Sequence, residues 1–557
     1  MPTPKNTILP LTIESLSSDG SGVGHYEGKA VFVPYTAPGD RIEARIVKDM
    51  GRYAFGILEK PVALSSQHIE PDCPVYRPCG GCCFRHLSYE AEAQAKEGFV
   101  RDALRRIGGL ELPVLPLLAS PLQQRYRNKV QFPVALNARG RVAAGFYAPR
   151  SHRLVPCADC RLQPRPLNEI AGGICDFLQQ NAIPVYSEQT HTGLVRHIFL
   201  RQGWHTGQIL VCLVINGRSL PHAQEFCESL TARFPSVRTV VLNVNRQKTN
   251  VITGAECISL HGPGYIEDTL CGVPVQLGPL SFYQVNTPGA ELLYGVAKQF
   301  AALRPGDTLL DLYCGMGTIG LSMVRECKEL IGVEIVPEAV ESARRNAAAM
   351  GAANTRFLCA DAGRAAAQLS AEGLAPDVIC LDPPRKGCDE ATLNAVCKMA
   401  PRTVVMVSCN PATAARDCAF LAAHGYRPVQ AQPVDLFPRT RHVETVVLLS
   451  HKKADSYIHI DVEFGEGEGK IPVDSIAKRA EAYKPKEKVT YKMIKEYIEA
   501  KYGFKVHTAY IAEVKRDLGL PMYDAPNAVE ELKQPRKHPT PEKVEAIKDA
   551  LRYFAVI

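Results

Sequence analysis

The chain has 557 residues, of which 46% are hydrophobic and 22% are charged. These are ordinary globular values, so collagen-like, mucin-like and wholly disordered proteins are excluded, and about 100–200 residues per domain predicts roughly three to five domains. The net charge is +7, and residues 61–160 hold 13 Lys and Arg against 8 Asp and Glu. A local excess of this size fits contact with a polyanion, although charge alone favours an ordinary solvated surface.

The 19 cysteines are too dilute for a small disulfide scaffold, and an odd number is awkward for a fully paired secreted protein. The first residues lack an apolar signal core, and no uninterrupted apolar stretch reaches about 18 residues. We therefore expect a cytoplasmic protein with no membrane segment. In a reducing compartment, clustered cysteines indicate metal binding or catalysis.

Residues 9–60 alternate short apolar strands with glycine turns. Leu11–Glu14 and Arg41–Val47 alternate at period two, and Asp19–Gly22 and Pro38–Asp40 are turn sequences. This pattern predicts a small closed barrel of the oligonucleotide-binding type, and it looks like a TRAM domain.

A tight cysteine cluster follows. Cys73, Cys79 and Cys82 are separated by five and two residues, with glycines between the last two. Short spacings let the backbone fold around one centre, and thiolates select zinc or an iron–sulfur cluster. The spacing does not decide between these two. A fourth ligand is needed, and Cys157 and Cys160 are the nearest candidates downstream.

From about residue 290, helices alternate with short buried strands, which predicts a doubly wound parallel sheet. Leu309–Gly320 is a strand that runs into a glycine turn, and Glu334 ends the next strand about 20 residues later, placed to accept the hydroxyls of an adenosine ribose. Asp311 precedes the glycines, where it would repel a phosphate and suit an amine. This favours S-adenosylmethionine, with a dinucleotide as the alternative.

Three further segments suggest chemistry at the edge of this sheet. Asp382 ends a buried strand and begins Asp-Pro-Pro-Arg, in which Arg385 stands where amine methyltransferases have an aromatic. Cys409 ends the next strand, where it is placed for nucleophilic attack or is a simple buried cysteine. Glu444 begins the last apolar strand, where it is a candidate proton acceptor or an ion-pair partner of a nearby arginine.

Residues 455–557 contain no cysteine, and prolines separate short helical stretches such as Tyr491–Tyr502. Gly465–Gly469 is the expected linker. We predict a small helical accessory domain, to which the sequence assigns no chemical role.

Taken together, residues 9–450 resemble the RNA uracil-5-methyltransferase family, and specifically the 23S ribosomal RNA members that carry a TRAM domain and an iron–sulfur cluster. The motifs that carry the resemblance are the cysteine triplet, Ser281–Asn286, the Asp311 turn, Asp382–Arg385, Ser408–Pro411 and His442–Glu444.

The resemblance implies an α/β fold with four parts. Residues 1–62 would be an OB-like TRAM barrel, 63–285 a central iron–sulfur α+β domain, 286–452 a doubly wound, Rossmann-like S-adenosylmethionine-dependent methyltransferase domain, and 453–557 a small C-terminal helical extension. The implied protein is a monomer that methylates carbon 5 of uridine in RNA, most simply ribosomal RNA.

The resemblance also assigns residues. Cys409 would be the nucleophile and Glu444 the proton acceptor. A [4Fe-4S] cluster would be held by Cys73, Cys79, Cys82 and Cys160, with Cys157 as a competing fourth ligand, and S-adenosylmethionine would be bound by Gln284, Tyr313, Glu334 and Asp382.

Three alternative functions share part of this sequence pattern. One is a tRNA uracil-5-methyltransferase, and another is a non-catalytic iron–sulfur protein that binds RNA. A radical S-adenosylmethionine methylthiotransferase is disfavoured, because it would need a three-residue and a two-residue cysteine spacing inside a barrel.

Overall fold

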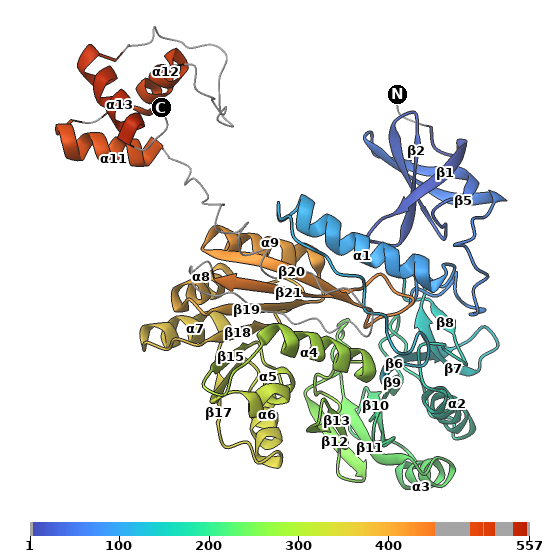
Figure 1. Ribbon diagram of the computed structural model, residues 1–557. Helices are drawn as coiled ribbons and strands as arrows, with labels where there is room; N and C mark the ends of the chain where they lie inside the picture. Colours follow the sequence, from blue (N-terminus) through green and yellow to red (C-terminus); the bar gives the residue numbers. More distant parts are fainter. Residues whose placement is uncertain (1–3, 452–490, 505, 519–538, 554–557) are drawn as a thin grey trace, which may run out of the picture. The chain divides into compact units, whose positions relative to one another are not determined.

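The computed structural model describes residues 4–451, 491–504, 506–518 and 539–553 (Figure 1). The chain divides into two compact units, Met1–Ser456 and Tyr457–Ile557, and each is described by itself. None of the helices in the described ranges is long and apolar enough to cross a membrane. The expected linker at Gly465–Gly469 lies outside the described residues.

The first five strands form a closed barrel in the order β1-β2-β3-β5-β4, and β1 closes it by pairing with β4. Alternate side chains of β1, such as Leu9, Leu11 and Ile13, point into its core. The predicted barrel is therefore confirmed, and the period-two pattern is its physical cause. Its strands are β1 Ile8–Leu16, β2 Ser21–Tyr26, β3 Lys29–Pro34, β4 Arg41–Asp49 and β5 Tyr53–Ala63.

Helix α1, Tyr89–Arg106, follows the barrel. The side chain of Ser88 caps it by accepting a hydrogen bond from the Ala91 N–H. Its Val100 and Leu104 share a core with strands that occur much later in the chain. Helix α9, Pro411–Ala423, packs beside it (Figure 1). Helix α1 therefore belongs in space to the C-terminal sheet of this unit.

A seven-stranded sheet in the order β12-β11-β10-β9-β6-β7-β8 occupies the middle of the unit. Helices α2 and α3 pack on one face of this sheet and share a hydrophobic core with it. Phe199, Leu210 and Cys212 of the sheet belong to a second core, which extends into the last sheet. Its elements are β6 Lys129–Leu136, β7 Val142–Tyr147, β8 Leu154–Pro156, α2 Arg165–Gln180, β9 Val195–Gln202, β10 Ile209–Ile215, α3 Ala223–Arg233, β11 Val237–Val244 and β12 Glu256–His261.

The last sheet has the order β17-β16-β15-β18-β19-β21-β20, with a small β13-β14 pair before it. Strands β15 to β19 are parallel, and β21 returns antiparallel to β19. Two separate cores lie on its faces, one with α4, α5 and α6 and one with α1, α7, α8 and α9. This arrangement confirms the predicted doubly wound sheet.

The elements of this region, besides α9, complete the unit. They are β13 Ile266–Leu270, β14 Val273–Leu277, α4 Thr287–Ala301, β15 Thr308–Leu312, α5 Thr318–Met323, the 3-10 turn η1 Val324–Glu326, β16 Glu329–Glu334, α6 Pro337–Ala349, β17 Thr355–Cys359, α7 Ala362–Ala371, β18 Val378–Leu381, α8 Glu390–Met399, β19 Thr403–Ser408, β20 Tyr426–Val434 and β21 Glu444–His451.

The described part of the second unit consists of helices α11 Tyr491–Tyr502, α12 Thr508–Asp517 and α13 Pro541–Tyr553. They share an apolar core that includes Ile494, Ile511 and Ile547. The helical texture predicted for this segment is observed, and Tyr491–Tyr502 has the predicted bounds. The boundaries at residues 62, 285 and 452 stay predictions.

Candidate active site and cysteine-lined cavity

Four predicted site residues lie at one edge of the last sheet. Tyr313 follows β15, Glu334 ends β16, Asp382 follows β18 and Cys409 follows β19. These strands are parallel neighbours, so their carboxyl ends meet at the same edge. The sequence placed each residue at a strand end, and the sheet order makes them neighbours.

The turn after Asp311 is shaped by a glycine and by a hydrogen bond to the Asp311 carboxylate. Gly317, with φ of 80°, adopts the left-handed conformation that glycine tolerates, and α5 begins directly after it. Asp311 Oδ2 accepts a hydrogen bond from the Gly320 N–H at 3.0 Å. Its Oδ1 is buried and has no hydrogen-bond partner in the described residues. Burial raises the pKa of this carboxyl to about 7, so the site favours a ligand that brings a donor or a positive charge.

Glu334 is fixed by backbone groups. Its Oε2 accepts a hydrogen bond from the Gly315 N–H at 3.0 Å, and its Oε1 accepts one from the Val336 N–H at 2.9 Å. Each oxygen keeps a free lone pair, which suits paired hydroxyls of a ribose. Ile335 beside it is 61% exposed, which leaves an apolar surface next to the carboxylate.

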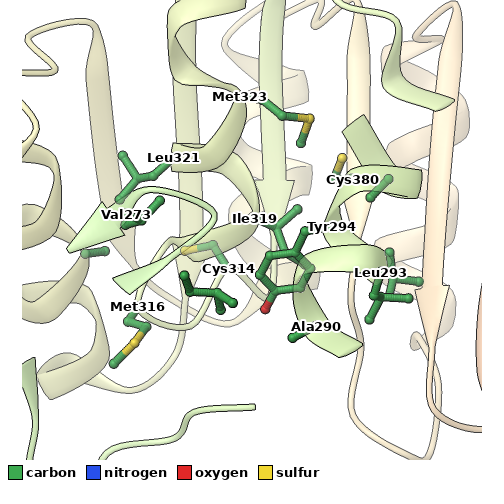
Figure 2. Close-up of a cluster of buried hydrophobic side chains, with 14 of the residues drawn as sticks. Val273, Ala290, Leu293, Tyr294, Cys314, Met316, Ile319, Leu321, Met323 and Cys380 are labelled. Atoms are coloured by element: carbon green, nitrogen blue, oxygen red, sulfur yellow. The ribbon is translucent and has the colours of Figure 1, made fainter. Parts of the chain in front are cut away.

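Tyr294 on α4 is a candidate site residue that has no signal in the sequence. Figure 2 shows its ring among the buried side chains of Ile319 and Cys314. Its hydroxyl lies 3.3 Å from Oγ1 of Thr318, and it also interacts with the Gln284 side chain and the charge of Asp382. A buried tyrosine at helical spacing is indistinguishable from core in the sequence, because only the fold brings its hydroxyl to Gln284.

Cys409 and Glu444 lie side by side because β21 returns antiparallel to β19. The last paired residues are Ser408 and Thr445, so the next positions along the two strands are Cys409 and Glu444. Burial raises the pKa of the half-buried Cys409 thiol, and the charges of Glu444 and Asp382 raise it further. Burial also raises the pKa of Glu444, which is 4% exposed, to about 8, and Asp382 adds to that rise.

Arg385 supplies a positive charge to this pair. Its guanidinium hydrogen-bonds the Cys409 side chain, and its charge lowers the pKa of both Cys409 and Glu444 against the larger effect of burial. The Asn410 side chain donates to the Arg385 carbonyl at 3.1 Å and ties the two strand ends together. The sequence marks Arg385 only as a departure from the aromatic of amine methyltransferases, whereas the structure brings it to the thiol. Neither Arg439 nor Arg441 forms an ion pair with Glu444 in the described part of the chain.

The loop before Glu444 is held by a buried ionic network. Lys96 of α1 lies 2.7 Å from Glu92 and 2.8 Å from Asp435, and all three side chains are fully buried. Lys96 also donates to the Phe437 carbonyl at 3.0 Å, and Glu92 accepts from the Arg439 N–H at 2.7 Å. Burial opposes the charge of Lys96, yet Glu92 and Asp435 outweigh it and raise the pKa of the ammonium.

The four predicted cysteine ligands and the competing Cys157 come together around one cavity of about 260 Å³. The Cys157 side chain hydrogen-bonds Cys160 and lowers the pKa of the Cys160 thiol. Burial raises the pKa of Cys82 to about 12, against the nearby Arg85 guanidinium. As they stand, no three or more His, Cys, Asp or Glu side chains in the described ranges are arranged so that they could hold a metal ion. The cysteines that line this cavity are Cys73, Cys79, Cys82, Cys157 and Cys160.

Comparisons with known proteins bear on this geometry. The tRNA (uracil-5-)-methyltransferase family model matches residues 278–452, and the TRAM domain model matches residues 3–58. An uncharacterized RNA methyltransferase of Halalkalibacterium halodurans is 41% identical over 452 residues, which cover 81% of this chain and 98% of that protein. One from Clostridium tetani is 38% identical over 451 residues, with the same coverage of 81% and 98%.

A solved structure shows the same fold. The crystal structure of Pyrococcus abyssi tRNA (uracil-54, C5)-methyltransferase in complex with S-adenosyl-L-homocysteine superposes with a TM-score of 0.63 and 26% identity. The match covers 79% of this chain and all of that one. The predicted family is thus confirmed. The chain is an RNA methyltransferase of the S-adenosylmethionine-dependent uracil-5-methyltransferase family and carries a TRAM domain at its N-terminal end.

Proposed function

We propose that this enzyme methylates carbon 5 of a uridine in ribosomal RNA, through a covalent bond between Cys409 and carbon 6 of the ring. The observation that carries the proposal is the placement of Cys409 beside Glu444 and Asp382 at the edge of the sheet. A nucleophile, a base and a binding edge for a nucleoside are the three components that this reaction needs.

The chemistry explains the residue types. Carbon 5 of uracil is a weak nucleophile, so the Cys409 thiolate first adds to carbon 6 and the electron pair moves toward carbon 5. Carbon 5 would then take the methyl group that bound S-adenosylmethionine supplies, and the cofactor sulfur would keep the electron pair of the broken bond as a thioether. Glu444 removes the proton that remains on carbon 5, the electron pair returns to the ring, and the bond between carbon 6 and the Cys409 sulfur breaks.

The surroundings of these two side chains fit their roles. A carboxyl with a pKa of about 8 is a stronger base than an exposed glutamate and can accept a proton near neutral pH. The Arg385 guanidinium stabilises the Cys409 thiolate when it forms. The uridine must leave any base stack to reach Cys409 at the sheet edge.

We propose that S-adenosylmethionine, which supplies the methyl group, is held by Gln284, Tyr313, Glu334 and Asp382. Glu334 would accept the ribose hydroxyls, and the exposed Ile335 would contact the base. The unpartnered, buried Oδ1 of Asp311 supports a ligand with an ammonium group. Tyr294 would orient Gln284 by its hydroxyl.

We also propose that Cys73, Cys79, Cys82 and Cys160 hold a [4Fe-4S] cluster. The donor set supports it, since thiols from two distant segments line one cavity and Arg85 would offset the negative charge of thiolates there. Cys157 hydrogen-bonds Cys160 and would serve as its neighbour, since Cys160 holds the fourth ligand position in the resemblance. The described cysteines would have to close around the cluster, because they form no metal site as they stand.

Transfer of labelled methyl to unmodified 23S ribosomal RNA and to unmodified tRNA tests the function. We expect incorporation into ribosomal RNA, with the label on carbon 5 of uracil by mass spectrometry. Incorporation into tRNA alone would make tRNA the substrate, as it is for the Pyrococcus abyssi enzyme. Label on another ring atom would contradict the mechanism.

A further inference from the structure

The loop of residues 435–443, here called the base loop, joins the two strands of the hairpin that carries Glu444. Val434 ends β20 and Glu444 begins β21, and these two residues face each other in the strand register. Among the described residues, no hydrogen bond or ion pair holds the Glu444 carboxylate, which is surrounded by buried groups and by the charges of Asp382 and Arg385. The place of this carboxylate therefore depends on how the base loop is held.

Four successive carbonyls of the base loop, those of residues 436–439, each accept a hydrogen bond from a different distant segment. The donors are three side chains and two N–H groups of the cysteine segment. They are Asn286 Nδ2 on Leu436 at 2.9 Å, Lys96 Nζ on Phe437 at 3.0 Å, the Tyr126 hydroxyl on Pro438 at 2.9 Å, and the Cys83 and Phe84 N–H groups on Arg439 at 3.0 and 3.2 Å. A loop of this length has many conformations by itself, and these contacts select one of them.

Tyr126 holds the base loop through its hydroxyl. The side chain is 0% exposed, and it reaches the Pro438 carbonyl across 312 positions of the chain. Burial raises the pKa of Tyr126 well above its usual value, so the hydroxyl keeps its proton and acts as the donor. A buried carbonyl that loses its donor costs about 1–3 kcal/mol, which favours movement of the loop toward another partner.

Arg439 holds the base loop through its backbone and its side chain together. Its φ of 69° lies in the left-handed region, which costs a residue with a side chain of order 1–3 kcal/mol. Its guanidinium is buried, donates to the Leu87 carbonyl at 2.9 Å and to Gln123 Oε1 at 3.2 Å, and lies 3.5 Å from Glu92 Oε2. These partners offset the cost of the backbone conformation and fix the turn that leads to β21.

We propose that Tyr126 and Arg439 are positioning residues of the methylation reaction, which hold the base loop so that the Glu444 carboxylate meets the proton on carbon 5 of uracil. The inference rests on the proposed function for the role of Glu444. A proton acceptor must come within about 2.6–3.2 Å, and a displacement of about 1 Å can slow such a step about 100-fold. Addition of the thiolate and methyl transfer depend on Cys409 at the end of β19, so they would continue while proton removal slows.

Single-turnover reactions with end-labelled RNA and labelled S-adenosylmethionine test the proposal. Tyr126→Phe removes the hydroxyl alone. We expect a methylated covalent protein–RNA adduct to accumulate on denaturing gels and product release to slow by at least about tenfold. The matched control is Tyr426→Phe, because Tyr426 is equally buried and donates to the Pro401 carbonyl at 3.1 Å, at the other end of β20 from the base loop. This control should lose similar stability and show no more adduct than the wild type.

Arg439→Gly is an independent variant. Glycine adopts positive φ without strain, so the change removes the guanidinium and leaves the loop conformation accessible. We expect the methylated adduct again, with unchanged affinity for S-adenosylmethionine. Arg196→Ala is the control, since Arg196 is also buried and donates to the carbonyls of Asn245 and Gln247 at 2.9 and 2.8 Å in the central sheet. A purely structural role would lower the active fraction without any adduct.

The outcomes separate this inference from the proposed function when Glu444→Gln is measured in parallel. If Glu444→Gln traps the adduct but Tyr126→Phe and Arg439→Gly release product normally, or slow down without adduct, the positioning role is wrong and the proposed function stands. If the wild type methylates RNA and Glu444→Gln traps nothing, the proposed role of Glu444 fails and this inference falls with it. Tyr126→Phe decides alone if Arg439→Gly does not fold.

Discussion

Lys96 and Asp435 are 339 positions apart, and Lys96 Nζ lies 2.8 Å from Oδ1 of Asp435 with both side chains fully buried. Lys96 lies on α1, directly after the barrel and the cysteine segment, whereas Asp435 begins the loop that leads to Glu444. The Cys83 N–H also donates to the Arg439 carbonyl of that loop at 3.0 Å. The segments before the central sheet therefore help to hold the loop that leads to β21 and Glu444.

Lys96→Met is expected to destabilise the protein by about 3–5 kcal/mol, because it leaves Glu92 and Asp435 as buried charges without their shared partner. Denaturant unfolding of the full chain measures this loss. Lys298→Met is the control, since its partner Glu326 is 40% exposed and such a pair contributes under about 1 kcal/mol. Equal losses in the two variants would contradict the role of the buried network.

Cys409→Ala is expected to bind S-adenosylmethionine normally and to lose methyl transfer by more than about 10³-fold, as removal of a nucleophile does. Cofactor binding by calorimetry and labelled methyl transfer separate the two effects. Cys257→Ala, an exposed cysteine of the central sheet, should keep full activity. If Cys409→Ala turned over about as fast as the wild type, Cys409 would not be the nucleophile.

Glu444→Gln is expected to accumulate a covalent protein–RNA adduct, because methyl transfer proceeds and the proton on carbon 5 then stays in place. Denaturing gels with end-labelled RNA detect the adduct as a slower band. The double variant Cys409→Ala/Glu444→Gln should show none, since the sulfur that forms the bond is absent. Full activity of Glu444→Gln without an adduct would leave Glu444 a structural residue.

The raised pKa of Glu444, about 8 against an ordinary 4.5, predicts opposite pH trends for activity and stability. Activity should rise with pH up to about 8, because only the ionised carboxylate accepts a proton. Between the two pKa values the folded state holds a proton that the unfolded chain has released. The contribution of Glu444 to the free energy of unfolding is therefore present below about 4.5 and falls as pH rises toward 8.

The pH dependence of kcat/KM in the wild type, and of the unfolding midpoint in the wild type and Glu444→Gln, tests this prediction. Glutamine does not titrate, so the decrease in stability between about 4.5 and 8 should be smaller in the variant. Identical stability profiles would contradict the raised pKa.

Anaerobically purified protein is expected to be brown, with about four irons per chain. Cys160→Ser should lose the iron and the visible absorbance, whereas Cys157→Ser should keep both, because Cys160 is the proposed fourth ligand. Iron and sulfide analysis with the absorbance spectrum measures both variants. One zinc per chain and no visible colour would exclude the cluster. If only Cys157→Ser lost the iron, Cys157 and not Cys160 would be the fourth ligand.

Most of the fold could be predicted from local patterns. The period-two alternation of β1 and β4 predicted a barrel, and the glycine turn after β15 predicted the start of a nucleoside-binding sheet edge. The cysteine spacing predicted the ligand triplet, and the resemblance to a known family chose Cys160 as the fourth ligand and the cluster as the metal group. Residues whose role depends on distant neighbours were missed, because a buried Tyr294 or Lys96 has no local signal that distinguishes it from core or surface.

The sequence by itself determined the strand ends at which Glu334, Asp382 and Cys409 lie, because strand length and turn chemistry act over a few residues. Tertiary structure alone decided that β21 returns antiparallel beside β19 and brings Glu444 to Cys409. It also decided that Arg385 contacts the Cys409 thiol and that Lys96 of α1 hydrogen-bonds the loop before Glu444. Sheet order and buried ion pairs join residues hundreds of positions apart, and their energies arise only when the whole core has formed.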